Sequence, residues 1–210
     1  MMRITKTLIY FHGFQSGAGT ATVGRFRRCL PDWRVEAPDI PQDPLEALDF
    51  LRTLCAELRP DVVLGTSLGA FYAHQMVGYH RIAVNPALHL SEMPEILHVG
   101  QYHYLQPRLK GDTTFEITDE IIRHFREAEQ RQWDHLRDRD GRAEPILGFF
   151  GTRDTTVDCR SDFEQHYGTA CTASFDGEHR MTDRIVSEVL APRGSLLDIK
   201  PPIRSTGPAG

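Results

Sequence analysis

Ser67 is the residue whose surroundings most clearly indicate chemistry. It stands in Gly65-Thr66-Ser67-Leu68-Gly69, after the strand-like stretch 61–64, which is apolar from Val62 on, and before small and aromatic residues typical of a helix. A serine raised above a strand end needs a sharp turn, and the flanking glycines allow the backbone to pass closely. The hydroxyl would then be an exposed nucleophile, and the Leu68 N–H would face an oxyanion. An ordinary strand-to-helix turn is the alternative interpretation.

A nucleophilic serine needs a base that takes its proton and an acid that orients the base. Asp154 follows the apolar run 145–150, and His179 follows the next strand-like run, 170–175. The order serine, aspartate, histidine, with each residue after a strand, predicts a catalytic triad at one edge of a sheet. Asp158 is the competing carboxylate. We expect it to cap the N–H groups at the start of the next helix instead.

The elements that must position these residues alternate between strand and helix. Short apolar runs predict strands over 7–11, 33–38, 61–64, 81–86, 145–150 and 170–175. Apolar residues at helical spacing predict helices over 20–29, 44–59, 68–79, 157–167 and 182–190, the second of them capped by Asp43. This alternation predicts an α/β fold with a mostly parallel sheet and helices on both faces. Ligands of such folds bind outside the carboxyl ends of the strands.

One segment interrupts the alternation. Residues 88–142 begin with proline and glycine punctuation and continue into a helix that starts at Thr118-Asp119-Glu120 and extends to Leu136. We interpret this segment as a small cap-like insertion at the carboxyl-end rim, although a plain helix packed on the domain is equally compatible. Residues 1–191 are therefore expected to form a single domain. Residues 192–210, rich in proline, glycine and serine, are expected to be a disordered tail.

The composition and the net charge indicate which class of molecule the protein binds. A net charge of −5 and a pI near 6.0 give no basic surface for nucleic acid. No apolar run reaches the ~20 residues that cross a bilayer, and no signal-peptide pattern is found, so we expect a cytoplasmic protein with a small-molecule partner. The four cysteines and ten histidines show no metal-binding spacing, and no metal site is expected. The sequence indicates no oligomeric state.

Taken together, the motifs resemble those of the α/β-hydrolases, and more narrowly those of the small YqiA-type esterases. The resemblance covers about residues 3–190, and the Asn-Pro-Ala step is the motif that narrows it to this subgroup. The matching motifs are Tyr10-Phe11-His12-Gly13-Phe14-Gln15-Ser16, Leu64 to Ala73, Ala83-Val84-Asn85-Pro86-Ala87, Gly151-Thr152-Arg153-Asp154 and Gly177-Glu178-His179.

The resemblance implies an esterase that needs no cofactor. In such an enzyme Ser67 would be the nucleophile, Asp154 the acid and His179 the base. The resemblance also implies that the backbone N–H groups of Phe14 and Leu68 form the oxyanion hole. The substrate would be a small acyl ester or thioester. An acyltransferase with the same triad and a non-catalytic binding protein on the same fold are the alternatives.

Four further residues are candidates for the site, and three of them have a second interpretation. His12, Gly13 and Asn85 are candidate substrate contacts, because they follow predicted strands at the edge where Ser67 is expected. His12 would otherwise brace its loop through hydrogen bonds, and Asn85 would otherwise end its strand by bonding its own backbone. Asp39 would either line the site or cap a turn.

Overall fold

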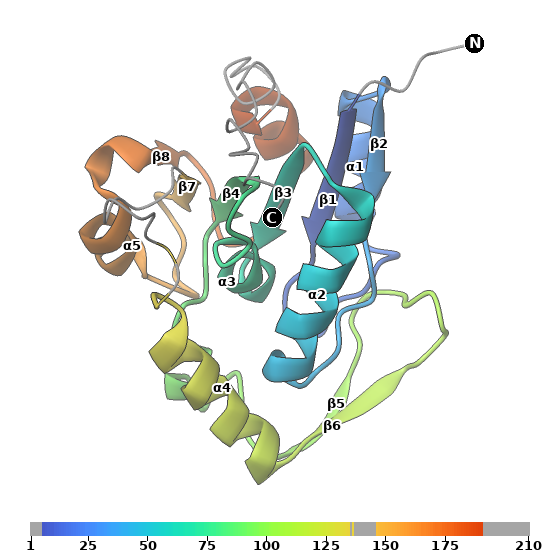
Figure 1. Ribbon diagram of the computed structural model, residues 1–210, viewed down its shortest axis with the longest axis vertical. Coiled ribbons are helices and arrows are strands. Elements are labelled where there is room, and N and C mark those ends of the chain that lie inside the picture. The colour runs from blue at the N-terminus through green and yellow to red at the C-terminus, as the bar shows by residue number, and fades with distance from the viewer. Residues whose placement is uncertain (1–5, 135, 137–145, 191–210) are drawn as a thin grey trace, which may run out of the picture.

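The computed structural model describes residues 6–134, 136 and 146–190, and its centre is a six-stranded parallel sheet. The strand order is β2-β1-β3-β4-β7-β8, and every neighbouring pair is parallel. The strands are β1 (Lys6–Phe11), β2 (Trp33–Glu36), β3 (Val62–Thr66), β4 (His80–Val84), β7 (Ile146–Gly151) and β8 (Thr172–Phe175). The predicted α/β fold class is confirmed. All carboxyl ends of the strands lie at one edge of the sheet (Figure 1).

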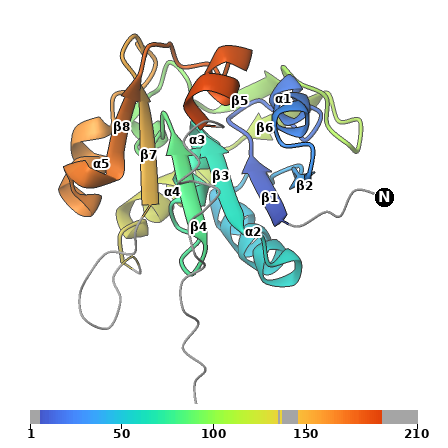
Figure 2. The same cartoon turned by 90° about the horizontal axis from the view of Figure 1, so that it is seen from above.

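Helices cover both faces of the sheet (Figure 2). Side chains alternate along β1, so Leu8 and Tyr10 belong to one buried cluster and Ile9 and Phe11 to the other. The first cluster is covered by α1 and η3, and the second by α2, α3 and α5. These helices are α1 (Ala21–Cys29), η3 (Ile185–Leu190), α2 (Pro44–Leu58), α3 (Leu68–Ala73) and α5 (Arg160–Tyr167).

Helix α2 begins and ends as its sequence predicts. Asp43 Oδ1 accepts hydrogen bonds from the N–H groups of Leu45 and Glu46 at 2.9 and 3.3 Å, which makes Asp43 the N-cap. Pro44 occupies the first turn, where its missing N–H costs nothing. The helix ends at Leu58, because Arg59 takes a left-handed conformation with φ 48°.

Helix α3 is shorter than predicted and ends at Ala73. The Arg81 guanidinium donates a hydrogen bond to the carbonyl of His74, which a longer helix would use internally. The next backbone bonds, such as Met76 N–H to Ala73 O at 3.1 Å, span only three residues. Gly78 then reverses the chain with φ 88°, so the prediction of a helix over 68–79 was wrong after the first turns.

The segment between β4 and β7 contains two strands that the sequence pattern did not predict. β5 (Gly100–His103) and β6 (Thr114–Ile117) form an antiparallel hairpin, after a short 3-10 turn, η1 (Leu90–Glu92). Helix α4 (Asp119–Arg131) follows; it is capped by the Thr118 hydroxyl and ends before the predicted Leu136. In Figure 1 the hairpin and α4 lie at the lower end of the molecule, toward which the arrowheads of β1 and β3 point.

The assignment of residues 1–191 to one domain, with a cap-like insertion at 88–142, stays a prediction. The expected tail at 192–210 lies outside the described residues. Within the ranges that the structure describes, no helix combines the length and the hydropathy that crossing a membrane requires.

Candidate active site

Ser67 occupies a strained turn between β3 and α3. Its backbone angles are φ 55° and ψ −122°, which a non-glycine residue rarely adopts. A Cβ added at Gly65 would lie 2.1 Å from the Gly69 carbonyl oxygen, and one added at Gly69 would lie 2.0 Å from the Phe11 carbonyl oxygen. Only glycine fits at either position. The strand, the turn and the helix therefore pack closely enough to present the serine above the edge of the sheet.

Ser67, His179 and Asp154 form one continuous chain of hydrogen bonds. The distance from Ser67 Oγ to His179 Nε2 is 2.9 Å, and the distance from His179 Nδ1 to Asp154 Oδ2 is 2.7 Å. The side chain of Asp154 is only 5% exposed and that of His179 is 20% exposed. An ionised Asp154 selects the tautomer in which Nδ1–H donates to the carboxylate and Nε2 is free to accept the serine proton.

The second oxygen of Asp154 fixes the loop after β7. Asp154 Oδ1 accepts hydrogen bonds from the N–H groups of Thr156 and Val157 at 2.8 and 3.2 Å. This local turn explains why α5 begins at Arg160 and not at the predicted Val157. Asp158 is exposed, and the N-cap residue of α5 is Cys159, which makes no side-chain capping bond. The expectation that Asp158 caps this helix was wrong.

The loop after β1 lies directly against the serine. A Cβ at Gly13 would be 3.3 Å from Ser67 Cβ and 3.8 Å from its Oγ. The ring of Phe14 packs edge-on against Tyr102 and Phe115 of the β5–β6 hairpin, with centroid distances of 5.2 and 5.6 Å. No hydrogen bond among the described residues uses the N–H of Phe14 or of Leu68. Both backbone donors are therefore available beside Ser67.

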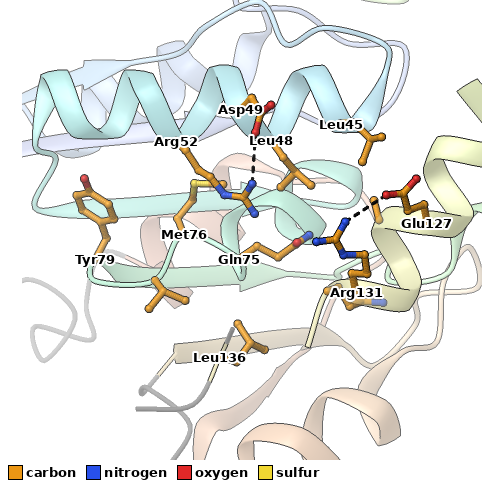
Figure 3. Close-up of a pocket in the computed structure, with 13 residues that line it drawn as sticks. Leu45, Leu48, Asp49, Arg52, Gln75, Met76, Tyr79, Glu127, Arg131 and Leu136 are labelled. Atoms are coloured by element: carbon orange, nitrogen blue, oxygen red, sulfur yellow. Dashed lines mark hydrogen bonds and ion pairs between the residues drawn. The ribbon is translucent and has the colours of Figure 1, made fainter. Parts of the chain in front are cut away.

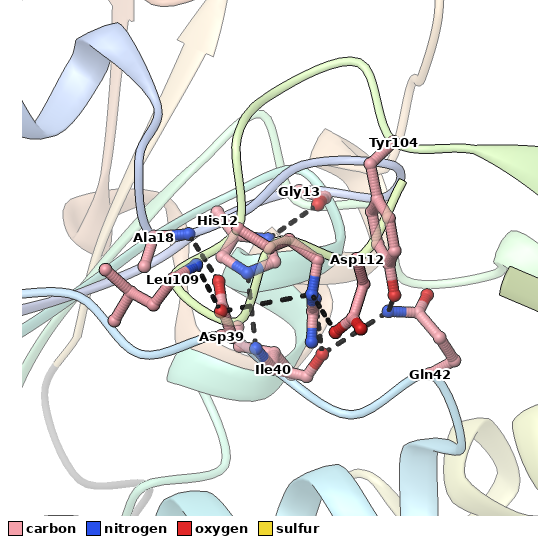
Figure 4. A network of polar contacts seen from close by, with 10 residues as sticks. His12, Gly13, Ala18, Asp39, Ile40, Gln42, Tyr104, Leu109 and Asp112 are labelled. Atoms are coloured by element: carbon pink, nitrogen blue, oxygen red, sulfur yellow. Dashed lines mark hydrogen bonds and ion pairs between the residues drawn. The ribbon is translucent and has the colours of Figure 1, made fainter. Parts of the chain in front are cut away.

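His12 braces its loop and offers no ring nitrogen to a substrate. His12 Nδ1 donates to the Gly13 carbonyl at 3.0 Å, and Nε2 accepts from the Ile40 N–H at 3.3 Å. The side chain is buried, and desolvation lowers its pKa to about 4, so the imidazole is neutral. Of the two interpretations from the sequence, the geometry favours the structural one (Figure 4).

The carboxylate of Asp39 does not line the site, because it makes hydrogen bonds to two other loops. Its Oδ1 accepts from the Ala18 N–H at 2.9 Å, and its Oδ2 accepts from the Leu109 N–H at 2.7 Å. Arg108 lies 4.0 Å from the same carboxylate and donates to the Ile40 carbonyl at 3.2 Å. Figure 4 shows this network between the loops after β1 and β2 and the tip of the hairpin. The insertion is thereby joined to the loop that carries Phe14.

One interpretation from the sequence was that Asn85 ends its strand by bonding its own backbone, and this was wrong, because its side chain bonds distant segments instead. The residue is buried, and its side-chain amide reaches the main chain of Glu178, His179 and Gly151. Nothing in the sequence signals these contacts, because the partners lie 66 to 94 residues away along the chain.

One cavity lies beside Ser67, and a larger groove lies elsewhere on the protein. A narrow cavity beside the serine is lined by the loop 12–16, residues 40–42, Leu68 and Tyr72. A larger groove of about 670 Å³ lies between α2 and α4 and contains none of the three hydrogen-bonded residues (Figure 3). Its charges are paired locally, Arg52 with Asp49 at 3.5 Å and Arg131 with Glu127 at 3.2 Å. The described residues contain no group of three or more possible metal ligands.

The sheet order, the helices on both faces and the serine turn after β3 define a protein of the α/β-hydrolase fold. The chain belongs to the uncharacterised protein family UPF0227, whose family model matches residues 7–190. This is the YqiA-type family that the sequence motifs resemble. No curated protein sequence matches the chain.

Solved structures show the same fold at low sequence identity. The esterase domain of a Rhodothermus marinus protein is 17% identical, with a TM-score of 0.63 over 91% of this chain and 87% of that chain. The mouse α/β-hydrolase domain-containing protein 10 is 13% identical, with a TM-score of 0.63 over 92% and 89%. Est1E from Butyrivibrio proteoclasticus is 15% identical, with a TM-score of 0.59 over 91% and 87%.

Proposed function

We propose that the protein is a serine hydrolase that cleaves carboxylic ester or thioester bonds of a small-molecule substrate through an acyl-enzyme. The observation that carries this proposal is the hydrogen-bond chain from Ser67 Oγ through His179 to Asp154, at 2.9 and 2.7 Å. These distances lie within the range that proton transfer between a nucleophile and its base requires. The chemistry uses only side chains and backbone amides of the protein.

The first half of the reaction forms the acyl-enzyme. Ser67 Oγ attacks the carbonyl carbon while His179 Nε2 takes the hydroxyl proton, and the carbonyl oxygen becomes an oxyanion. The N–H groups of Phe14 and Leu68 donate to this oxygen. The tetrahedral intermediate then collapses, and the protonated His179 gives its proton to the departing alcohol or thiol. Asp154 remains ionised and stabilises the imidazolium throughout.

The second half regenerates the serine. His179 Nε2 takes a proton from a water molecule, whose oxygen attacks the acyl carbon and forms a second tetrahedral intermediate. Its collapse breaks the bond to Ser67 Oγ, returns the proton to the serine and releases the carboxylic acid. An acyltransferase would use an acceptor alcohol, thiol or amine in place of this water. No contact among the described residues favours such an acceptor.

The comparisons support the same class of reaction. One of the structural neighbours is named an esterase domain, and another is named an α/β-hydrolase domain-containing protein. At their level of identity this likeness concerns the fold, so the proposal depends on the geometry of Ser67, His179 and Asp154.

The test is a panel of p-nitrophenyl esters of increasing chain length, assayed with wild type and Ser67→Ala. We expect wild type to turn over one or more of these esters and Ser67→Ala to lose on the order of 10⁶ in turnover, as other triad nucleophiles do. An organophosphonate should label wild type at Ser67 and leave the variant unlabelled. Labelling at another residue, or equal turnover by both proteins, would contradict the proposal.

A further inference from the structure

Asn85 links three segments through one buried side chain. Its Nδ2 donates to the carbonyl oxygens of Glu178 and His179 at 3.1 and 3.2 Å, and its Oδ1 accepts from the Gly151 N–H at 2.8 Å. Its own N–H donates to the Phe149 carbonyl at 2.8 Å. The residue is only 2% exposed. Both hydrogens of the amide group and its oxygen are therefore used inside the protein.

These partners belong to the loops that carry the proposed acid and base. Gly151 ends β7 three residues before Asp154, and Glu178 and His179 form the loop after β8. The two loops also touch each other directly. Arg153 N–H donates to the Gly177 carbonyl at 3.0 Å, and a Cβ on Gly151 would lie 2.6 Å from that same oxygen. Among the described residues, however, the hydrogen bond to the main chain of His179 itself comes from Asn85.

We propose that Asn85 is a positioning residue, which holds the backbone of His179 so that its ring meets both Ser67 and Asp154. This inference rests on the proposed function. The arrangement suits an amide, because two carbonyl oxygens need donors and one N–H needs an acceptor. An aspartate of the same shape would satisfy the Gly151 N–H but would place a carboxylate against two carbonyl oxygens. A displacement of about 1 Å in a catalytic group can cost 10² in rate.

The backbone at Asn85 allows the amide to be removed cleanly. The residue has φ 44°, a left-handed conformation that glycine adopts without steric cost. The variant Asn85→Gly therefore removes the side chain, and glycine can keep the same backbone conformation at this position. Arg59→Gly is the matched control, because Arg59 also has a positive φ, 48°, and is an exposed residue at the end of α2.

The test compares wild type, Asn85→Gly, Asn85→Asp, Arg59→Gly and Ser67→Ala in hydrolysis of p-nitrophenyl acetate. Reactive sites in each protein are counted by titration to completion with an organophosphonate, so that unfolded molecules do not enter the turnover number. We expect kcat per titrated site to fall about 10²-fold in Asn85→Gly and at least as far in Asn85→Asp, with KM little changed. Labelling by the phosphonate should slow in parallel, and Arg59→Gly should match wild type.

The outcomes separate the two claims. If Asn85→Gly or Asn85→Asp keeps the wild-type kcat per titrated site, the positioning role is wrong while the function of Ser67 stands. A loss confined to thermal stability, with unchanged kcat, leads to the same conclusion. If hydrolysis by wild type equals that of Ser67→Ala, the proposed function fails and the inference fails with it.

Discussion

At the scale of single residues, Asp154 uses its two carboxylate oxygens differently. Oδ2 faces His179 Nδ1 at 2.7 Å, whereas Oδ1 accepts from two N–H groups of its own loop. The loop therefore orients the carboxylate before any substrate arrives, and the carboxylate in turn orients the histidine.

This arrangement predicts that replacing Asp154 and replacing Asp158 by asparagine have different effects on turnover. In Asp154→Asn the amide can keep an oxygen toward Thr156 and Val157, but its NH₂ group would then face His179 Nδ1 and select the wrong tautomer. Turnover of p-nitrophenyl acetate should fall by about 10⁴, as in the serine-protease precedent, with little loss of stability. Asp158→Asn is the matched control. It should keep near-normal turnover, and its free energy of unfolding should change by less than about 0.5 kcal/mol.

The reverse result, an inactive Asp158→Asn beside an active Asp154→Asn, would show that the acid of the proposed triad had been assigned to the wrong carboxylate. Thermal and urea unfolding of both variants would check that the comparison is made between folded proteins.

At this scale, a residue's role can be predicted from the sequence where that role follows from its neighbours in the chain. The glycines two residues before and after Ser67 predict its turn, because their missing side chains permit the close approach that the structure contains. His12 and Asn85 were harder, because their roles depend on Ile40 and on the loop of His179, which are distant in sequence. A histidine or asparagine at a strand end has the same local pattern whether it contacts a substrate or braces a loop.

At the scale of elements, apolar periodicity predicted the sheet and most helices, but it missed the β5–β6 hairpin. Each hairpin strand has only four residues, and the connecting residues 104–113 lack a short turn signal. Hydrogen bonds to segments distant in the sequence hold the hairpin in place. The Leu105 N–H donates to the Gln15 carbonyl at 2.7 Å, and the Gly19 N–H donates to the Pro107 carbonyl at 2.9 Å. Such contacts cannot be inferred from a local window of sequence.

Because the residues that connect β5 and β6 pack closely against the loop after β1, a side chain added at Gly17 should destabilise the protein. A Cβ there would lie 2.5 Å from the Pro107 carbonyl oxygen and 2.8 Å from Arg108 Cγ. We expect Gly17→Ala to lower the free energy of unfolding by about 1–3 kcal/mol, because the hairpin or the loop after β1 must move. Urea denaturation measures this change.

Gly24→Ala provides the control for the same substitution. Gly24 lies inside α1, and an added Cβ would meet only Arg28 Nη1, at 3.5 Å. Alanine is the better helix former, so this variant should gain about 0.5–1 kcal/mol. Equal stability of Gly17→Ala and wild type would show that the hairpin is not held against the loop after β1 in solution.

At the scale of the whole molecule, two buried histidines are neutral because burial lowers their pKa values. The first, His12, lies in the loop after β1. His74 follows α3, where its Nδ1 pairs with the Tyr167 hydroxyl and its Nε2 pairs with Gln132 Oε1, both at 3.1 Å. Burial lowers the pKa of His74 to about 3, and the neighbouring charge of Arg81 acts in the same direction. His74 thus joins the end of α3 to α5 and to the residue that follows α4.

These two histidines predict how stability depends on pH. Their pKa values in the folded protein, about 4 and about 3, lie below the ordinary value of 6.5. Between pH 6.5 and 4 these two residues therefore bind more protons in the unfolded chain than in the folded protein, and their contribution to the free energy of unfolding falls as the pH falls. Each histidine contributes a slope that approaches about 1.4 kcal/mol per pH unit well below pH 6.5. Urea denaturation at intervals from pH 7.5 to 5 should reveal this decline.

His74→Gln isolates one of the two contributions, because glutamine is neutral throughout and can still donate and accept hydrogen bonds. This variant should be less stable than wild type at pH 7.5, since glutamine cannot reproduce both contacts of the ring, yet its stability should fall less steeply toward pH 5. The difference in slope should approach about 1.4 kcal/mol per pH unit. Parallel curves for the two proteins would mean that His74 has the same pKa, about 6.5, in the folded and in the unfolded protein. Below that pH the contacts to Tyr167 and Gln132 would then have to be made by an imidazolium, which donates from both nitrogens and would require the Tyr167 hydroxyl to act as an acceptor.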